Sequence, residues 1–449
     1  MKNDASIKQY LLVEGTWAFV GRVLTAFIGL VLSALLAKLL SPSDMGTYFL
    51  ALNLAMFLSI FARMGLENTL LRFVSEAIGR KQQDCIPQLI QKSLLLALLA
   101  TGIVTTGFYV GAGTWLAERV FHSDTLGMVI GFITIWLVLL AFQSLFVEIF
   151  RAFQDIRMTV FFNGLITASL GLVFVTLYWL IVGHVSLNQL FPWILVAATV
   201  NIILAVWVLW RKYHVFSLSG KASVSYRELA NHSWPLLLST LAFFVMAKSD
   251  LWILAAFRSV EEVAIYGAAV SLVALTSMPL TIVNAVVPPL IARLHVQGQK
   301  QRAERILRTT ATLVMIPVVV VLIVFIFFGD TLLSLIFGDY YRSGGTVLII
   351  LSLGQAVNVY VGSCGYTLIM MGQQRILLVI AIISAAVSVC FGLIWVQTWG
   401  ATGVAVATTL GVSLQQILML CLVRYQCGIW THAGIRFIPD YKSVKEMFV

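Results

Sequence analysis

Charged side chains inside long apolar stretches are the residues of this sequence whose type and placement could carry chemistry. Arg22 lies about five residues into the first stretch, Arg63 about three residues before the end of the second, and Lys248 about fourteen residues into the seventh. A charge in the hydrocarbon core of a membrane is costly, so each is a functional candidate. Three cations facing one cavity would bind an anion, and arginine and lysine both suit phosphate.

Two carboxylates accompany these cations. Glu67 follows Arg63 by four positions, a spacing at which helical side chains can form an ion pair. Asp250 follows Lys248 by only two, so these side chains do not face each other and each needs a partner elsewhere. We treat Asp250 and Glu67 as candidates for ion coupling or for tuning the charge of the site. The alternatives are that Arg22 and Arg63 extend to the headgroups, and that Lys248 and Asp250 pair with other spans.

Glu148 is a different case, because it lies near the end of an apolar stretch and three residues before Arg151. This spacing predicts a local ion pair on a helix.

Enzyme motifs are missing from the sequence. It contains no Walker A loop, no His-Glu-x-x-His and no nucleophile elbow. The six histidines lie in loops or at the edges of apolar stretches, and the five cysteines lack metal-ligand spacing. We therefore predict no catalytic residue, no metal site and no cofactor. Without an ATP site, uphill transport would require a proton or sodium gradient or the membrane potential.

The elements that position the charges are membrane helices. The chain has 449 residues, of which 60% are hydrophobic and 11% charged, whereas about a quarter of a soluble protein is charged. Stretches of about 20 apolar residues span a bilayer, and helices satisfy their backbone polar groups there. We predict twelve such helices, at 17–40, 45–66, 89–111, 126–149, 158–181, 190–210, 234–256, 263–288, 309–328, 345–370, 376–396 and 402–423.

The basic residues predict the orientation. If the N-terminus is cytosolic, 22 of the 29 lysines and arginines fall on the cytosolic side, 4 on the opposite side and 3 within spans. This is a strong positive-inside pattern, and it places both termini in the cytoplasm. It also explains the net charge of +10 without nucleic acid as a partner.

The two halves of the chain resemble each other. Ser41-Pro-Ser-Asp-Met-Gly-Thr-Tyr48 corresponds to Ser259-Val-Glu-Glu-Val-Ala-Ile-Tyr266 at an offset of 218, and Arg157 corresponds to Arg375 at the same offset. We predict a six-helix bundle at 1–210, a cytosolic linker at 211–233, a second six-helix bundle at 234–423 and a cytosolic tail at 424–449. Within the linker, 226–232 is either a helix at the membrane interface or plain polar chain. Transporters with such repeats bind their substrate between them.

Several of these segments resemble one family. Leu39–Phe73 contains Leu-Leu-Ser-Pro-x-Asp-x-Gly-x-Tyr, then Arg-x-Gly-Leu and Leu-Leu-Arg-Phe. The second half adds Lys248-Ser-Asp250 and Val-Val-Pro-Pro-Leu-Ile-Ala-Arg293. The chain resembles the Wzx-type polysaccharide and O-antigen flippases of the multidrug/oligosaccharidyl-lipid/polysaccharide (MOP) exporter superfamily. It departs from them at Ala264, where relatives often have glycine.

The resemblance implies an all-α polytopic membrane protein of the MATE-like MOP fold. Two pseudo-symmetric six-helix bundles would surround a central cavity that opens alternately to each membrane face. The substrate would be an oligosaccharide on undecaprenyl pyrophosphate, moved from the inner to the outer leaflet of the bacterial inner membrane. Arg22, Arg63 and Lys248 would then bind the pyrophosphate, and a polymerase and chain-length regulator of the same pathway would be possible partners.

Two other functions remain open. A multidrug or toxin exporter of the same superfamily would favour an acidic cavity, whereas the deep charges here are net basic. The lipid II flippase branch is nearer but usually has two additional spans. A membrane glycan ligase, polymerase or glycosyltransferase would carry a large external loop with acidic, arginine or histidine groups, and the external loops here are short.

Overall fold

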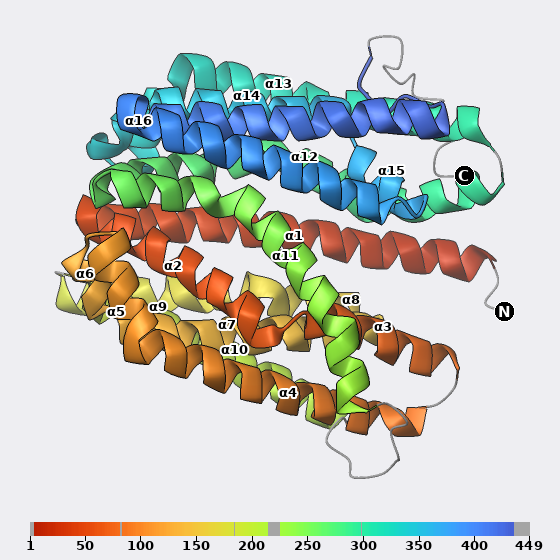
Figure 1. Cartoon of the computed structure of the whole chain (residues 1–449), viewed down its shortest axis with the longest axis horizontal. Helices are drawn as coiled ribbons and strands as arrows, with labels where there is room; N and C mark the ends of the chain where they lie inside the picture. The colour runs from red at the N-terminus through yellow and green to blue at the C-terminus, as the bar shows by residue number, and fades with distance from the viewer. Residues whose placement is uncertain (1–3, 81–82, 184, 214–224, 298, 435–449) are drawn as a thin grey trace. The chain divides into compact units, whose positions relative to one another are not determined.

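In the computed structural model, most of the described residues are helical (Figure 1). It describes residues 4–80, 83–183, 185–213, 225–297 and 299–434. The chain divides into two compact units, Met1–Phe244 and Val245–Val449. The predicted boundaries of the bundles and linker are the points at which the chain leaves the membrane. The division into two compact units does not test these boundaries. The second half of the predicted tail, 435–449, and most of the linker, 214–224, lie outside the described residues.

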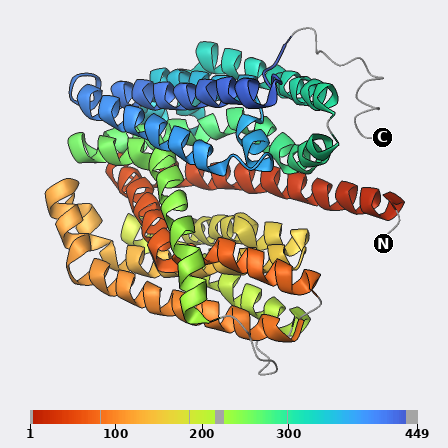
Figure 2. The ribbon, with the colours of Figure 1, turned by 45° about the vertical axis from the view of Figure 1, so that its right-hand side comes forward.

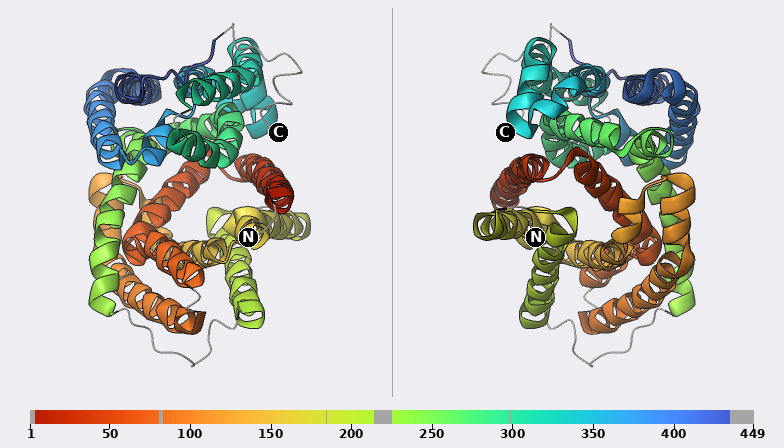
Figure 3. Two further views of the ribbon diagram at one scale, coloured as in Figure 1. Left: turned by 90° about the vertical axis from the view of Figure 1, so that its right-hand side faces the viewer. Right: turned by 90° about the vertical axis from the view of Figure 1, so that its left-hand side faces the viewer.

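Unit 1 contains ten complete helices and the first part of an eleventh among its described residues. Short 3-10 or π-helical turns join several of them, at Gln83–Cys85, Phe108–Ala112, Leu116–Val120 and Phe161–Leu165. The helices are α1 (Asp4–Leu39), α2 (Pro42–Arg63), α3 (Leu66–Gly79), α4 (Ile86–Gly107), α5 (Gly113–Trp115), α6 (Asp124–Met128), α7 (Ile130–Ala152), α8 (Ile156–Val160), α9 (Ile166–Val182), α10 (Leu187–Tyr213) and α11 (Tyr226–Phe257). Figure 3 shows α1 beside α8 and α9, both of which it contacts.

Among its described residues, unit 2 contains the end of α11 and five further helices. They are α12 (Val260–Val296), α13 (Lys300–Phe337), α14 (Gly345–Val361), α15 (Cys364–Met370) and α16 (Gln374–Cys427), with a 3-10 turn at Asp339–Gly344. Helices α12, α13 and α14 pack on one another, and α14 also packs on α16 (Figure 2).

Helix α16 has two arms that meet at Gly400. This glycine has φ 55° and ψ −134°, which interrupts the helical hydrogen bonds. Carbonyl groups at a helix end need other donors. Arg258, after α11, donates from Nε to the Val396 carbonyl and from Nη2 to the Gln397 carbonyl, both at 2.9 Å. The predicted spans 376–396 and 402–423 are these two arms.

The predicted membrane helices are confirmed. The described residues contain eleven helical segments that are long and apolar enough to cross a membrane, and the last of them, Arg375–Cys427, holds both arms of α16. Each of the twelve predicted spans overlaps one of these segments or arms. The chain is therefore a multi-pass membrane protein of the predicted fold class.

The repeated serines begin equivalent helices. Ser41 accepts a hydrogen bond from the Asp44 backbone N–H at 3.1 Å before α2, and Ser259 accepts one from the Glu262 N–H at 3.4 Å before α12. Both are N-caps, which satisfy backbone donors at a helix start. The sequence repeat thus reflects a repeated local structure.

Helix α11 begins within unit 1. The segment 226–232, predicted as an interface helix or a polar linker, forms its first two turns and continues into the span. Leu229 and Ser233 are fully buried, and Ser233 shares a hydrogen bond with Thr69 of α3 at 2.8 Å. The start of α11 is therefore part of the packed core of unit 1.

Candidate functional site

Arg63 and Glu67 form an ion pair at the junction of α2 and α3. Met64 and Gly65 have φ of 52° and 74°, so α2 ends after Arg63 and the chain turns into α3. The turn still brings Arg63 Nε to 3.4 Å from Glu67 Oε1, and their side chains are 16% and 9% exposed. The predicted pairing is thus observed, although the two residues lie on different helices.

Burial is the main influence on Glu67. It raises the pKa of the Glu67 carboxyl above its ordinary value, and the Arg63 charge opposes this only in part. Within the described residues, Glu67 Oε2 has no hydrogen-bond partner. The carboxyl therefore holds a proton more readily than an ordinary glutamate.

A second ion pair lies close to the first. Glu148 Oε1 and Arg151 Nη1 are 2.9 Å apart on α7, as their spacing predicted. Glu148 also interacts electrostatically with Glu67 and Arg63. Unit 1 thus holds a cluster of two arginines and two glutamates at the end of α2, the start of α3 and the end of α7, in which three of the four side chains are largely buried.

Arg22 differs from the residues of this cluster, because its side chain is exposed. The preceding residue, Gly21, packs so closely against Val160 of α8 that a larger side chain would overlap it. This contact fixes one face of α1 against α8, while Arg22 on the next position is accessible.

Lys248 and Asp250 lie in α11 within unit 2, and they differ in burial. Lys248 is half-buried. Asp250 is buried, and its Oδ2 accepts a hydrogen bond from the Tyr266 hydroxyl at 2.8 Å while its Oδ1 accepts one from the Leu251 N–H. Asp250 thus has the partner on another span that its spacing from Lys248 required.

Tyr266 is the residue that sequence reasoning missed. It is fully buried, on α12, and it is the last residue of the repeated segment. Its counterpart Tyr48 packs instead among aromatic rings, 5.9 Å from Trp136 and 6.4 Å from Phe191 between centroids. The offset of 218 places Leu32 at the position of Asp250. The buried carboxylate is therefore a feature of the second repeat, and a position-by-position comparison of the repeats would have singled out Asp250. The same comparison would not have found Tyr266, because both repeats have tyrosine there.

The structure brings the predicted site residues together in two sets. Arg63 and Glu67 are paired within unit 1, which also holds Arg22. Lys248 and Asp250 lie in unit 2. That the three cations serve one anion site stays a prediction.

Comparison with known families decides the assignment. Residues 11–295, well over half of the chain, match the model of the polysaccharide biosynthesis protein family. The chain belongs to this family. Residues 235–394 also match the MatE family model. The predicted kinship with MOP-superfamily exporters is confirmed.

A curated relative agrees with this family. The chain is 23% identical over 205 residues to the probable low-salt glycan biosynthesis flippase Agl15 of Haloferax volcanii. The match covers 45% of this chain and spans only 43% of that relative's length.

Solved structures show the fold. An inward-facing multidrug resistance MATE family transporter of the MOP superfamily superposes with a TM-score of 0.76 at 15% identity, over 90% of this chain and 94% of that one. The lipid II flippase MurJ, in an inward closed conformation, gives 0.72 at 12% identity, over 93% and 88%. A MOP superfamily transporter from Pyrococcus furiosus gives 0.68 at 14% identity, over 94% and 96%. The chain has the fold of these transporters.

Proposed function

We propose that this protein is a flippase that moves an undecaprenyl-pyrophosphate-linked oligosaccharide from the inner to the outer leaflet of the bacterial inner membrane. The observation that carries the proposal is membership of the polysaccharide biosynthesis family on a MOP fold. Both termini would be cytoplasmic, as the positive-inside pattern predicts. The product would supply the synthesis of a cell-surface polysaccharide.

The substrate dictates what the protein must do. The sugar head and pyrophosphate are too polar for hydrocarbon, whereas the lipid carrier can remain in the bilayer. Transport then needs a polar path that opens alternately to each face, which is a shift between two conformations of the chain. No covalent step is required, so the protein would act as a transporter and not as an enzyme.

The pyrophosphate would be met by Arg22, Arg63 and Lys248. Arg22 is exposed and can reach an anion without breaking the α1 packing. Arg63 is held by Glu67, so an anion must compete with that carboxylate. Protonation of Glu67 would release Arg63, which would couple pyrophosphate binding to proton uptake.

Asp250 is the second candidate for coupling. Its carboxylate is buried beside Tyr266, and the nearby positive charge of Lys248 acts on it. A proton or sodium ion reaching Asp250 would change the charge that Lys248 experiences and hence its hold on an anion. A polymerase and a chain-length regulator of the pathway would act on the product at the outer face.

The deciding experiment uses cells that lack this protein but retain the rest of its glycan pathway. The leaflet of the lipid-linked oligosaccharide is measured after adding back wild type, Lys248→Gln or Arg342→Gln. Arg342 is an exposed cation of the same unit and serves as the matched control. We expect wild type and Arg342→Gln to deliver glycan to the outer leaflet, and Lys248→Gln to leave it at the inner leaflet. Normal outer-leaflet glycan without the protein, in a strain with no redundant flippase, would overturn the proposal.

Multidrug export is a second candidate, because residues 235–394 match the MatE model. The same cells distinguish it. An exporter would protect them from cationic drugs and leave the glycan unchanged, whereas a flippase would do the opposite.

A further inference from the structure

A small pocket in unit 2 has no role in the proposed transport. It has a volume of about 230 Å³ and lies where the end of α12, the start of α13, the turn before α16 and the end of α16 meet. At about 30 Å³ per water molecule, it holds the equivalent of seven or eight waters. That is room for a phosphate group with a few attached atoms and too little for an oligosaccharide.

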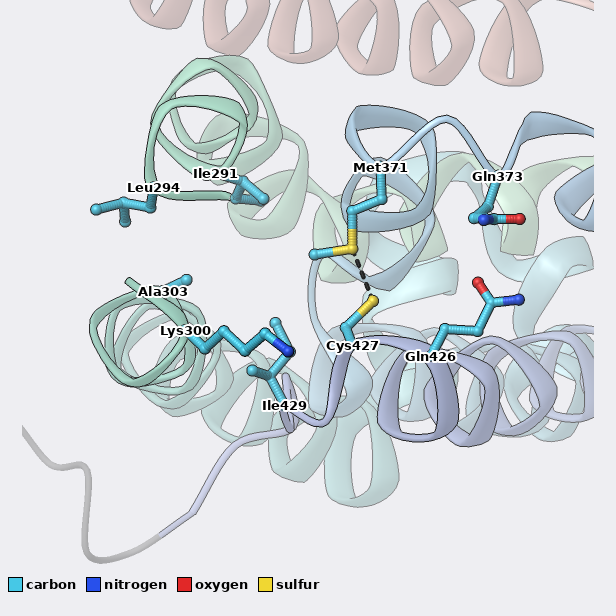
Figure 4. A pocket seen from close by; sticks show the side chains of 9 residues that line it. All are labelled: Ile291, Leu294, Lys300, Ala303, Met371, Gln373, Gln426, Cys427 and Ile429. Carbon is cyan, nitrogen blue, oxygen red and sulfur yellow. Dashed lines mark hydrogen bonds between the residues drawn. The ribbon is translucent and has the colours of Figure 1, made fainter. Parts of the chain in front are cut away.

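The polar groups of the pocket can all donate hydrogen bonds to an anion. Figure 4 shows Lys300 extending its amine toward the pocket from α13, with the side-chain amides of Gln373 and Gln426 on the other side. Within the described residues, no hydrogen bond or ion pair occupies these three side chains. Lys300 and Gln426 are exposed and Gln373 is half-buried, so these donors can turn toward a phosphate that enters the pocket from outside.

Comparison of the two repeats shows how the pocket differs from the equivalent part of unit 1. At the offset of 218, Gln373 corresponds to Asp155 of unit 1. There the Asp155 carboxylate accepts hydrogen bonds from Lys212 and Tyr213, the last residues of α10. In unit 2 the carboxylate is replaced by a neutral amide, and the end of α16 supplies Gln426 and Cys427 instead. The pocket thus has a neutral amide at the position where unit 1 has the Asp155 carboxylate.

The surroundings add positive charge. The first three turns of α13 carry Lys300, Arg302, Arg305 and Arg308, with Glu304 as their one acidic residue. Glu304 is paired with Arg308 at 3.5 Å. Within the described residues Glu304 forms no ion pair with Lys300, the one cation that lines the pocket.

The other walls of the pocket indicate the source of the anion. Ile291 and Leu294 of α12 and Ile429 after α16 give it an apolar side. Tyr425 nearby is 88% exposed, and the Arg424 guanidinium lies 5.2 Å from the Trp430 ring centroid. Exposed aromatic and basic side chains together are typical of the membrane–water interface, which is the depth of lipid headgroups.

We propose that this pocket binds the phosphate of an anionic phospholipid headgroup, with Lys300 as the charge and Gln373 and Gln426 as hydrogen-bond donors. The acyl chains would leave past the apolar wall. Under the proposed topology the pocket faces the cytoplasmic leaflet, where basic pockets between membrane helices bind such headgroups. A lipid held there would tie α12, α13 and α16 together at one end.

The test is made on the purified full-length protein in mild detergent, so it does not depend on transport. Phosphatidylglycerol, phosphatidylcholine or inorganic phosphate is added at matched concentrations, and bound lipid is counted by native mass spectrometry alongside thermal unfolding. We expect phosphatidylglycerol alone to bind and to raise the Tm, since a ligand selective for the native state stabilises it.

Two variants and one control locate the site. Lys300→Gln removes the charge, and Gln373→Asp introduces the carboxylate of unit 1; both should weaken phosphatidylglycerol binding about tenfold, as loss of a charged hydrogen bond does. Arg302→Gln removes an equal charge from the same turn outside the pocket and should leave binding within about twofold.

Three results would overturn the proposal. Equal losses in Lys300→Gln and Arg302→Gln would mean diffuse attraction without a site. Equal binding of phosphatidylcholine would remove the role of the charge. A Tm shift with inorganic phosphate and none with the lipid would assign the pocket to free phosphate.

Discussion

The Tyr266 hydroxyl donates a 2.8 Å hydrogen bond to Asp250 Oδ2 and so joins α11 to α12 inside unit 2. Tyr266 is fully buried and Asp250 is 9% exposed. A buried carboxylate requires such donors, because its desolvation is otherwise uncompensated. The pair therefore fixes the half of α11 that also carries Lys248.

Removing the Tyr266 hydroxyl should lower the stability of the folded protein. We expect Tyr266→Phe to lower the free energy of unfolding by about 1.5–3 kcal/mol, the range for a hydrogen bond to a charged group. Thermal unfolding of the purified protein measures it. The control is Tyr48→Phe, at the repeat-equivalent position among aromatic rings, which should cost less than about 0.5 kcal/mol. Equal losses in both variants would contradict a specific role for the Asp250 bond.

Glu67 should give the protein a measurable pH dependence. Burial raises the pKa of its carboxyl above the ordinary 4.5. Because the folded-state pKa is the higher one, the stabilising contribution is complete below the unfolded pKa and is lost as pH rises through the folded pKa. Each pKa unit between the folded-state and unfolded-state values corresponds to about 1.4 kcal/mol in the free energy of unfolding. We therefore expect Glu67→Gln to gain stability relative to wild type as the pH rises from acidic to neutral.

The measurement is the Tm of both proteins across that range, with Glu76→Gln as control. The Glu76 side chain is 40% exposed, and its pKa is lowered, first by the hydrogen bond from Arg72. A Tm difference between wild type and Glu67→Gln that stays constant with pH would contradict the assignment.

The sequence was sufficient for what depends on local pattern. Long apolar stretches gave the membrane helices, since a span is defined by length and hydrophobicity alone. The spacing of Arg63 and Glu67 predicted their ion pair, and the spacing of Glu148 and Arg151 predicted a second ion pair. The positions of the repeated serines anticipated two equivalent helix starts.

What the sequence could not give depends on contacts between distant helices. In the sequence, Tyr266 resembles the other tyrosines of the apolar spans. Its hydrogen bond to Asp250 is known only once α11 and α12 are packed together. The contact of Gly65 with α11 links residues about 170 positions apart. The Lys300 pocket likewise joins four chain segments, and its residues are ordinary types with no motif spacing. Such sites become visible only when the fold is known.

Asp155 predicts the opposite pH response to Glu67. Burial disfavours its ionisation, but the hydrogen bonds from Lys212 and Tyr213 outweigh this and hold its pKa below the ordinary 3.8. Its stabilising contribution is therefore present above the unfolded pKa and is lost as pH falls through the folded pKa. Because Lys212 is half-exposed, solvent screens the pair, and we expect Asp155→Asn to cost about 1 kcal/mol at neutral pH.

The cost should shrink as the pH is lowered through the Asp155 pKa, where the wild-type carboxyl becomes protonated. Chemical unfolding of Asp155→Asn and wild type at neutral and acidic pH measures this cost. The control is Asp84→Asn, at an exposed aspartate in the 3-10 turn Gln83–Cys85. A cost that grows toward acidic pH would show that Lys212 and Tyr213 do not stabilise the charged form.

Gly65 should tolerate no side chain, because two constraints act on it at once. Its φ of +74° is unfavourable for residues with a Cβ, and a Cβ there would lie 2.7 Å from the backbone nitrogen of Leu237 in α11. Relief would require α11 to move away from α3 and would break the Thr69–Ser233 hydrogen bond. We expect Gly65→Ala to cost more than about 2 kcal/mol and to reduce the yield of folded protein. Gly102→Ala, on α4 with open space around it, should be neutral or slightly stabilising, because alanine favours helices. If both variants fold and unfold like wild type, the start of α11 is not held against α3 as the structure shows.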